Sequence, residues 1–194
     1  YENILKCSEK QFVVKASGLA GGKGVILPNT IQELFDVVKE MLEDGKFGSA
    51  SSEIIIEERL EGVEVSIMGF CNGETVELMP QSQDYKKIYD NDKGLNTGGM
   101  GSHAPVFILN DEQLSSVKND MIKVVKKLNY RGILYAGIMK TSDGPYFLEF
   151  NCRMGDPEAQ VLFSLIDTQK TDLYSVFKSC MNGSQININW KDCY

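Results

Sequence analysis

The chain has 194 residues, of which 42% are hydrophobic and 18 are glycine, a composition typical of a globular protein with a buried core. Its net charge of −7 argues against a nucleic-acid partner, because sequence-independent binding to phosphate backbones needs a basic surface. The apolar runs, such as 25–27 and 54–56, are much shorter than a membrane span, and no signal peptide opens the sequence. We therefore expect a cytoplasmic protein without a nucleic-acid or membrane partner.

The five cysteines favour a cytosolic protein with reduced thiols. They are odd in number and widely scattered, and no Cys-x-x-Cys pair occurs, which excludes the usual zinc and thioredoxin-type patterns. The single histidine, His103, leaves a Ser/His/Asp or Cys/His arrangement with only one candidate base. A hydrolase that uses a protein nucleophile is therefore disfavoured.

The start of the chain predicts two short strands followed by a helix. Residues 12–15 form a buried strand, a glycine-rich loop follows, and a second apolar run covers 25–27. Thr30 and Glu33 have the spacing of a capping box, in which a hydroxyl and a carboxylate satisfy free N–H groups at a helix start. The helix should end near Gly45, and its apolar residues at helical spacing are Leu34, Phe35, Val38, Met41 and Leu42.

The middle of the chain predicts a third strand, a β-hairpin and a long loop. A strand at 53–58 precedes a hairpin whose strands run over 63–71 and about 74–79. Asn72-Gly73 is typical of a type I′ turn, in which both central residues need positive φ. Residues 81–105 are polar, glycine-rich and without periodicity, so we expect a long loop there, and such loops are usually functional or disordered.

The end of the chain predicts a helix, two strands and two further helices. Apolar residues at helical spacing predict a helix over about 111–128, and strands follow at 132–141 and 145–151. Asp156-Pro157 indicates a helix start, with Asp156 as the N-cap and proline at the first helical position. A last helix is expected over about 171–181. This order of elements favours an α+β fold with antiparallel sheets.

Lysine and glycine are concentrated in the segment 15–25. Glycine lets backbone N–H groups close on phosphate oxygens, and lysine adds a mobile positive charge. The segment is not a Walker A loop, because Ser17 stands where that pattern needs glycine and Gly24 follows Lys23 where it needs Ser or Thr. From composition alone, the segment is equally compatible with a phosphate-binding loop and with a structural turn that has a solvent-facing lysine.

Glu149 and Asn151 are candidate metal ligands. They lie two residues apart in a predicted strand, so their side chains should point to the same face. Two neighbouring oxygen ligands suit Mg²⁺, which prefers oxygen and is commonly shared with nucleotide phosphates. Arg153 is expected on the same face, where it could bind a phosphate or carboxylate bidentately. The alternative is a polar strand face at the edge of the sheet.

Two further polar segments are candidates for binding sites. The acidic segment 57–64 connects two strands and could be a solvated turn or a hinge that binds adenine and ribose. In the predicted long loop, Asp84 and the glycine-rich segment 94–101 could wrap a small substrate or form a flexible surface loop.

The order and spacing of these segments resemble the phosphoribosylamine–glycine ligase (glycinamide ribonucleotide synthetase) family of the ATP-grasp superfamily. The resemblance covers about residues 12–183. Asn-Thr-Gly-Gly-Met-Gly at 96–101 and Glu-Phe-Asn-Cys-Arg at 149–153 separate this family from other ATP-grasp members. The other matching segments are 13–19, 22–26, 56–58, 134–137, 155–158 and 160–161.

The resemblance implies ATP as a substrate and Mg²⁺ or Mn²⁺ as the metal, with Glu149 and Asn151 as metal ligands. ATP-binding residues implied by the resemblance are Lys15, Lys23, Glu57, Glu58, Leu60, Glu64, Lys87 and Asn96. Catalytic roles are implied for Lys23, Asp84 and Arg153. Contacts with glycine or 5-phosphoribosylamine are implied for Asp84, Gly99, Arg153 and Asp156.

Four residues depart from the family pattern. Gly21 stands in place of alanine, Tyr85 of histidine, Lys87 of arginine and Met154 of phenylalanine. None of these differences removes an implied metal ligand or Lys23, which the resemblance places in a flap that folds over the phosphates. Because Tyr85 lies beside Asp84, the contacts with substrate are where we expect this chain to differ.

The resemblance also implies an ATP-grasp fold whose two lobes, with antiparallel sheets, clamp a nucleotide. Residues from about 12 to 80 would contain the nucleotide flap and hinge, and residues from about 81 to 194 the catalytic and metal-binding lobe. The family's N-terminal Rossmann-like domain and C-terminal domain are not in this sequence, which begins with Tyr1. We therefore expect residues 1–194 to be part of a longer, multifunctional purine-biosynthesis chain.

The implied reaction is the ligation of glycine to 5-phosphoribosylamine. Glycine carboxylate attacks the γ-phosphate of ATP to give glycyl phosphate and ADP, and the amine then displaces phosphate to form glycinamide ribonucleotide. The alternatives are an ATP-grasp ligase for another carboxylate and a catalytically silent ATP-binding module. We expect the isolated chain to bind nucleotide weakly without turnover.

Overall fold

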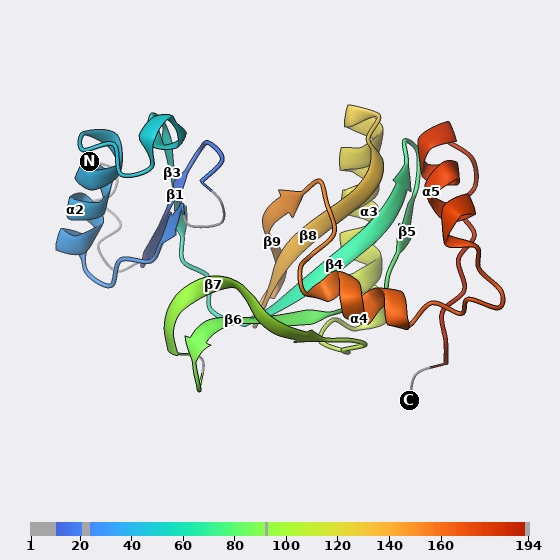
Figure 1. Ribbon diagram of the computed structural model, residues 1–194. Helices are drawn as coiled ribbons and strands as arrows, with labels where there is room; N and C mark the ends of the chain where they lie inside the picture. The colour runs from blue at the N-terminus through green and yellow to red at the C-terminus, as the bar shows by residue number, and fades with distance from the viewer. Residues whose placement is uncertain (1–10, 21–23, 92, 193–194) are drawn as a thin grey trace. The chain divides into compact units, whose positions relative to one another are not determined.

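The computed structural model describes residues 11–20, 24–91 and 93–192, and it divides the chain into two compact units at Leu60/Glu61 (Figure 1). The sequence-based division near residue 80 lies about one hairpin later in the chain. The earlier boundary follows from strand pairing, because β4 (Val63–Asn72) pairs along its whole length with β8 (Arg131–Thr141) of the second unit. Each unit is described separately below.

The first unit has a three-stranded antiparallel sheet with the order β2-β1-β3 and one α-helix. The strands are β2 (Val25–Ile26), β1 (Phe12–Ala16) and β3 (Ile54–Glu58). The helix α2 (Ile31–Leu42) packs its apolar stripe against this sheet, and a short 3₁₀ helix, η1 (Gly48–Ser51), precedes β3. The buried residues of this core are Val14, Leu34, Val38 and Met41.

The start of α2 confirms one half of the predicted capping box. The Thr30 hydroxyl oxygen accepts a hydrogen bond from the Glu33 N–H at 3.1 Å. The Glu33 carboxylate accepts from the N–H of Asn29 at 2.7 Å, one residue before the position that a capping box uses. The helix ends at Leu42, before Gly45, as its periodicity predicts.

The second unit has a four-stranded antiparallel sheet with the order β5-β4-β8-β9, where β5 is Val76–Leu78 and β9 is Gly144–Asn151. Helix α3 (Asp111–Leu128) covers one face of this sheet. Helices α4 (Glu158–Ser164) and α5 (Leu173–Asn182) lie against the other face, as Figure 1 shows. Two apolar cores, one on each face, therefore hold the unit together.

Residues opposite each other in antiparallel strands share a face, so the register determines which side chains lie together. Tyr135 is opposite Asn151, and Gly137 is opposite both Glu149 and Ser66. These side chains therefore lie on the face away from α3. A β-bulge separates Phe147 from Glu149, because their partners Ile138 and Gly137 are consecutive. The bulge keeps Glu149 and Asn151 on the polar face.

The predicted long loop at 81–105 is wrong, because most of it forms a two-stranded antiparallel hairpin. Its strands are β6 (Gln83–Tyr89) and β7 (Lys93–His103), drawn in green in Figure 1. The register shifts between Tyr85 and Lys87 and again between Lys87 and Tyr89. An irregular, polar hairpin lacks the alternation of apolar residues by which strands are predicted.

The turn at 72–75 and the bounds of α4 differ from the predictions, whereas the predicted helices at 111–128 and near the end of the chain are confirmed. The 72–75 turn has only Gly73 at positive φ (+97°), so the type I′ expectation is wrong although the hairpin is confirmed. Helix α4 begins one residue later than predicted, with Pro157 as its N-cap, and the Asp156 carboxylate accepts from Gln160 Nε2 at 3.0 Å. The predicted helix over 111–128 is confirmed, as is the last helix, which runs from Leu173 to Asn182.

In the part of the chain that the structure describes, no helix is long and apolar enough to cross a membrane.

Candidate functional site

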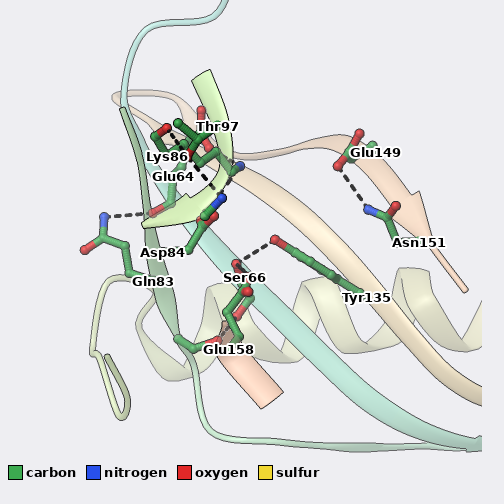
Figure 2. A network of polar contacts seen from close by, with 12 residues as sticks. Glu64, Ser66, Gln83, Asp84, Lys86, Thr97, Tyr135, Glu149, Asn151 and Glu158 are labelled. Carbon is green, nitrogen blue, oxygen red and sulfur yellow. Dashed lines mark hydrogen bonds and ion pairs between the residues drawn. The ribbon is translucent and has the colours of Figure 1, made fainter. Parts of the chain in front are cut away.

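The face of the second sheet away from α3 is apolar at one end and polar at the other. Met68 and Phe70 of β4 are buried in the core beneath α4 and α5. Two and four residues earlier in β4, Ser66 and Glu64 point to the same face and belong to a polar network that also includes residues of β6, β8 and α4 (Figure 2). A hydrogen-bonded network on a largely buried sheet face is a candidate functional site.

Lys86 of β6 lies at the centre of the carboxylates in this network. Its ammonium nitrogen is 2.7 Å from Glu64 Oε2 and 3.8 Å from Asp84 Oδ1. The Thr97 hydroxyl of β7 donates to the Lys86 carbonyl oxygen at 2.8 Å, and Gln83 Nε2 donates to the Glu64 carbonyl oxygen at 3.0 Å. The hairpin β6–β7 is therefore fixed to β4 at the polar end of the sheet (Figure 2).

The electrostatics of this cluster hold Lys86 protonated and disfavour ionisation of Asp84. Burial by itself lowers the pKa of Lys86, but the charges of Glu64 and Asp84 and the hydrogen bond to Glu64 outweigh it and raise that pKa above its ordinary value. Burial raises the pKa of Asp84, Lys86 lowers it, and the neighbouring carboxylates Glu158 and Glu64 raise it further. The cluster therefore has the ammonium group of Lys86 and three carboxyl groups, those of Glu64, Asp84 and Glu158.

A second chain of hydrogen bonds lies beneath this cluster. The Glu158 carboxylate of α4 accepts from the Ser66 hydroxyl at 3.0 Å, and the Ser66 and Tyr135 hydroxyl oxygens are 2.8 Å apart. All three residues are at most 6% exposed. Burial raises the pKa of Tyr135, so its hydroxyl stays protonated at neutral pH.

A cavity of about 520 Å³ opens beside Lys86. Its lining includes four of the sequence-predicted site residues, Glu64, Asp84, Lys87 and Asn96. Gly62, Val63, Gln83, Tyr85, Lys86 and Asn91 complete the lining. Residues from the acidic segment and from the predicted loop thus meet at one concave site, which is large enough for part of a nucleotide or a small substrate.

The candidate metal ligands Glu149 and Asn151 lie side by side on β9, as the two-residue spacing predicts. Asn151 Nδ2 donates to Glu149 Oε1 at 3.0 Å (Figure 2). Over the described residues there is no group of three or more His, Cys, Asp or Glu side chains that could hold a metal by themselves. Two oxygen-bearing side chains fit a Mg²⁺ ion that takes its other ligands from phosphates and water.

Arg153 and Asp156 lie in the segment between β9 and α4, and Gly99 lies within β7. Arg153 follows the end of β9, is exposed, and donates from Nη1 to the Met154 carbonyl oxygen at 2.9 Å. Gly99 of β7 has φ of +130°, and a Cβ there would lie 2.8 Å from the Asp156 carbonyl oxygen. The structure therefore brings Gly99 and Asp156 together across a close backbone approach.

In the first unit, Lys15 of β1 and Glu57 of β3 form an ion pair of 2.5 Å on neighbouring strands. Glu58 is exposed and Leu60 is half-buried. Lys23 lies outside the described residues. Gly18 lies close to other backbone, since a Cβ there would lie 2.7 Å from Ala50 Cα. Gly24 lies close to a side chain, since a Cβ there would lie 2.7 Å from Ala20 Cβ.

Sequence reasoning named Glu64 and Asp84 of this network but missed Ser66, Gln83, Lys86, Thr97, Tyr135 and Glu158. Ser66 and Tyr135 are polar residues with apolar neighbours in largely buried stretches of their strands, which is a signal that could have identified them. Lys86 lies two residues after Asp84 in a strand, but its segment was expected to be a loop. Glu158 gives no local signal, because its partner Ser66 lies 92 residues earlier.

Comparisons with known proteins agree with this fold. The chain resembles the crystal structure of phosphoribosylamine–glycine ligase from Thermotoga maritima with a TM-score of 0.85 and 31% identity over 98% of this chain and 49% of that one. A biotin carboxylase domain from Hydrogenobacter thermophilus, solved with MgADP, is 18% identical with a TM-score of 0.69 and supports the fold alone. The antiparallel sheets and these neighbours define an α+β ATP-grasp fold.

The family follows from the sequence matches. The model of the phosphoribosylglycinamide synthetase ATP-grasp (A) domain matches residues 1–159. A trifunctional purine biosynthetic protein adenosine-3 from Chironomus tentans is 46% identical over 93% of this chain, and a phosphoribosylamine–glycine ligase from Halalkalibacterium halodurans is 42% identical over 93%. The chain belongs to the phosphoribosylglycinamide synthetase ATP-grasp family. It spans 14% of the first relative's length and 43% of the second's.

Proposed function

We propose that this chain is the ATP-binding and catalytic part of a ligase that joins glycine to 5-phosphoribosylamine in purine biosynthesis. The observation that supports the proposal best is the cavity beside Lys86, where Glu64, Asp84, Lys87 and Asn96 meet. The names of the relatives point to the same reaction, because they are phosphoribosylamine–glycine ligases and trifunctional purine biosynthetic proteins. A longer chain with further activities and a cytosolic location belong to the same proposal.

The proposed reaction has two steps. An oxygen of the glycine carboxylate attacks the γ-phosphorus of ATP, the bond to the bridging oxygen breaks, and ADP leaves. The phosphoribosylamine nitrogen then attacks the carbonyl carbon of glycyl phosphate, phosphate leaves, and the nitrogen loses a proton. Such a reaction needs positioned substrates and compensated phosphate charge more than a protein nucleophile.

In this proposal the residues of the chain divide between nucleotide and substrate. The proposed contacts with ATP are made by Lys15, Glu57, Glu58, Leu60, Glu64, Lys87 and Asn96. Glu149 and Asn151 hold Mg²⁺ or Mn²⁺, which when bound offsets the charge of the phosphates. Asp84, Gly99, Arg153 and Asp156 position glycine and the amine, and Arg153 binds anionic oxygens bidentately.

Lys23 and its neighbouring glycines form the flap in this proposal. Water must be kept from the acyl phosphate, because hydrolysis would waste ATP, and a glycine-rich loop that closes over the site would exclude it. Lys23 would also add positive charge beside the phosphates during transfer.

The first test is Mg²⁺-dependent ATP binding by calorimetry with the chain and its Glu149→Ala variant. We expect binding that requires Mg²⁺ and is lost in Glu149→Ala. Glu77→Ala is the matched control, because Glu77 is a partly exposed glutamate of β5 whose ion pair with Lys118 is 3.7 Å long. Unchanged binding in Glu149→Ala would contradict the metal role, and no binding to the unaltered chain would contradict a nucleotide site formed by this chain.

The second test is product analysis with the full-length protein that contains this chain. Glycine-dependent formation of ADP with 5-phosphoribosylamine, giving glycinamide ribonucleotide, is the expected result. Turnover with another carboxylate and not glycine would indicate a different ATP-grasp ligase. ATP binding without turnover of any acid would indicate a catalytically silent module.

A further inference from the structure

Tyr85 of β6 is an aromatic residue of the cavity to which the proposed reaction assigns no contact. It lines the cavity beside Lys86 and is 55% exposed. Apart from Gly62 and Val63, the other residues of the lining are polar or charged. A large ring that borders a polar cavity and keeps half of its surface exposed offers an apolar area that a bound molecule can cover.

The ring of Tyr85 is held in place by His103 of β7. Their ring centroids are 5.5 Å apart and their planes differ by 16°, which is the geometry of an offset stack. Tyr85 is opposite Gly101, and its diagonal neighbour His103 lies two residues further along β7. Gly101 places no side chain opposite the tyrosine. Because His103 covers one face of the ring, Tyr85 has its other face and its edge for the cavity.

The polar groups of the same lining suit a phosphorylated sugar. A carboxylate such as that of Glu64 accepts hydrogen bonds from sugar hydroxyls, and the amide of Asn96 both donates and accepts. The Lys87 ammonium donates to the Gly94 carbonyl oxygen at 3.3 Å, and since it has three hydrogens it can also donate to a phosphate. The aromatic ring adds a wall against which the C–H groups of a pentose can pack.

Glycine fits these features less well than a ribosyl phosphate does. It has a single CH₂ group, which needs no aromatic wall, and it would fill little of a cavity of about 520 Å³. In the proposed reaction, both ATP and 5-phosphoribosylamine contain a ribose that carries phosphate. The chemistry that the cavity recognises is therefore shared by two substrates, and separate probes can distinguish them.

We propose that Tyr85 is a substrate-binding residue and that the sugar of a ribosyl phosphate packs against its ring in the cavity. His103 is a positioning residue, which holds the ring through the stack and does not contact the sugar. The stack and the lining are features of the hairpin β6–β7 and of the start of β4. The identity of the two sources, ATP and 5-phosphoribosylamine, rests on the proposed function.

The stack is tested in the 194-residue chain by proton NMR. His103 is the only histidine of the chain, so each of its imidazole C–H groups gives a single signal. Protons over an aromatic face are shielded, and Tyr85→Leu should therefore move these signals to higher chemical shift. Tyr174→Leu is the matched control, because Tyr174 is an exposed tyrosine of α5 whose ring contacts Lys178. Signals that do not move in Tyr85→Leu would overturn the proposal.

The occupant is tested by titrating the chain with ribose 5-phosphate, with ADP and Mg²⁺, and with inorganic phosphate. We expect one of the two ribosyl phosphates to move the His103 signals to saturation, and inorganic phosphate to leave them in place. Tyr85→Leu should weaken binding of that probe roughly 3- to 10-fold, and Tyr85→Phe, which keeps the ring, should change it by less than about twofold.

A response to ribose 5-phosphate would assign the site to the amine substrate, and a response to ADP would assign it to the nucleotide. The proposal would be overturned if neither probe moved the signals or if inorganic phosphate moved them equally. Equal affinity of the responding probe for the unaltered chain and for Tyr85→Leu would also contradict it.

In an active full-length ligase, Tyr85→Leu should raise the KM of the substrate that the responding probe identifies, with little change in kcat. His103→Leu should raise the same KM by a smaller factor, and Tyr174→Leu should change neither constant. An unchanged KM in Tyr85→Leu would overturn the binding role of Tyr85. Absence of ligation by the unaltered protein would instead contradict the proposed function, and the titrations would still decide whether Tyr85 binds a ribosyl phosphate.

Discussion

At the scale of single residues, Lys86 compensates carboxylates that the fold brings together from different strands. Glu64 comes from β4 and Asp84 from β6, and the Asp84 side chain is only 7% exposed. The Lys86 and Glu64 side chains keep 35% and 44% exposure, so solvent screens their attraction and limits its contribution to stability. Lys86 also lowers the pKa of Asp84, whose side chain is more deeply buried than that of Glu64.

Lys86→Met should therefore destabilise the chain by about 1 kcal/mol at neutral pH. The pKa of Asp84 is already raised by burial, and removing Lys86 raises it further. A raised carboxyl pKa means that the folded state binds the proton more tightly, so stability is present at low pH and is lost as pH rises through the folded pKa. The destabilisation should accordingly be smaller near pH 4 than at pH 7.

Urea unfolding at several pH values measures this difference. Lys118→Met is the matched control, since Lys118 of α3 forms a partly exposed pair with Glu77 of β5 at 3.7 Å. Its effect should be smaller and nearly independent of pH. A Lys86→Met variant whose destabilisation does not grow with pH would show that Asp84 does not depend on this ammonium.

At the scale of elements, β7 closely approaches the segment before α4. Gly99 has φ of +130°, and a Cβ there would also lie 2.5 Å from Pro157 Cδ. The Ser102 hydroxyl donates to the Pro157 carbonyl oxygen at 2.9 Å, which fixes the same two elements together. Side chains are excluded at residue 99 for both conformational and steric reasons.

Gly99→Ala should cost about 1–3 kcal/mol, because the backbone strain and the collision with Pro157 both act on it. Gly98→Ala is an unusually close control, since a Cβ at Gly98 would meet nothing within 4 Å and its φ is not positive. Denaturant unfolding of the two variants compares them directly. Equal stability of the two would mean that the hairpin shifts to accept the methyl group without cost.

The elements also divide into those that the sequence predicts and those that it does not. Helices α2 and α3 follow from apolar periodicity, and α2 also from its cap at Thr30, which are local signals. The hairpin β6–β7 was missed because its strands are polar and rich in glycine, and because it is held to the sheet through contacts such as Lys86 with Glu64. Strand pairing over long sequence separation leaves no local pattern.

The same distinction applies to the site. Glu149 and Asn151 could be paired from the sequence because two residues of spacing in one strand place side chains on one face. The Ser66, Tyr135 and Glu158 chain joins residues 69 and 92 positions apart, so only the folded sheet brings its members together. The roles of the residues that line the cavity came from resemblance, and they stay predictions until ligand binding is measured.

At the scale of the whole molecule, the two units differ greatly in the apolar core that stabilises them. Over the described residues, the first unit has one cluster of four buried residues, and the second has clusters of twelve and nine. Burial of apolar surface is the main favourable contribution to folding, so opening the first unit should need less free energy than opening the second. The structure therefore predicts two levels of protection within one chain.

Native-state hydrogen exchange followed by mass spectrometry tests this difference. Peptides from β1 and α2 should exchange at a lower opening free energy than peptides from β4 and β8. Leu34→Ala removes a fully buried side chain from the smaller core and should lower its protection by about 2–5 kcal/mol. Protection of β4 and β8 should be unchanged, because their cores contain no residue of the first unit. If Leu34→Ala lowered protection equally in both units, they would open as one cooperative body, and the prediction of two levels of protection would be wrong.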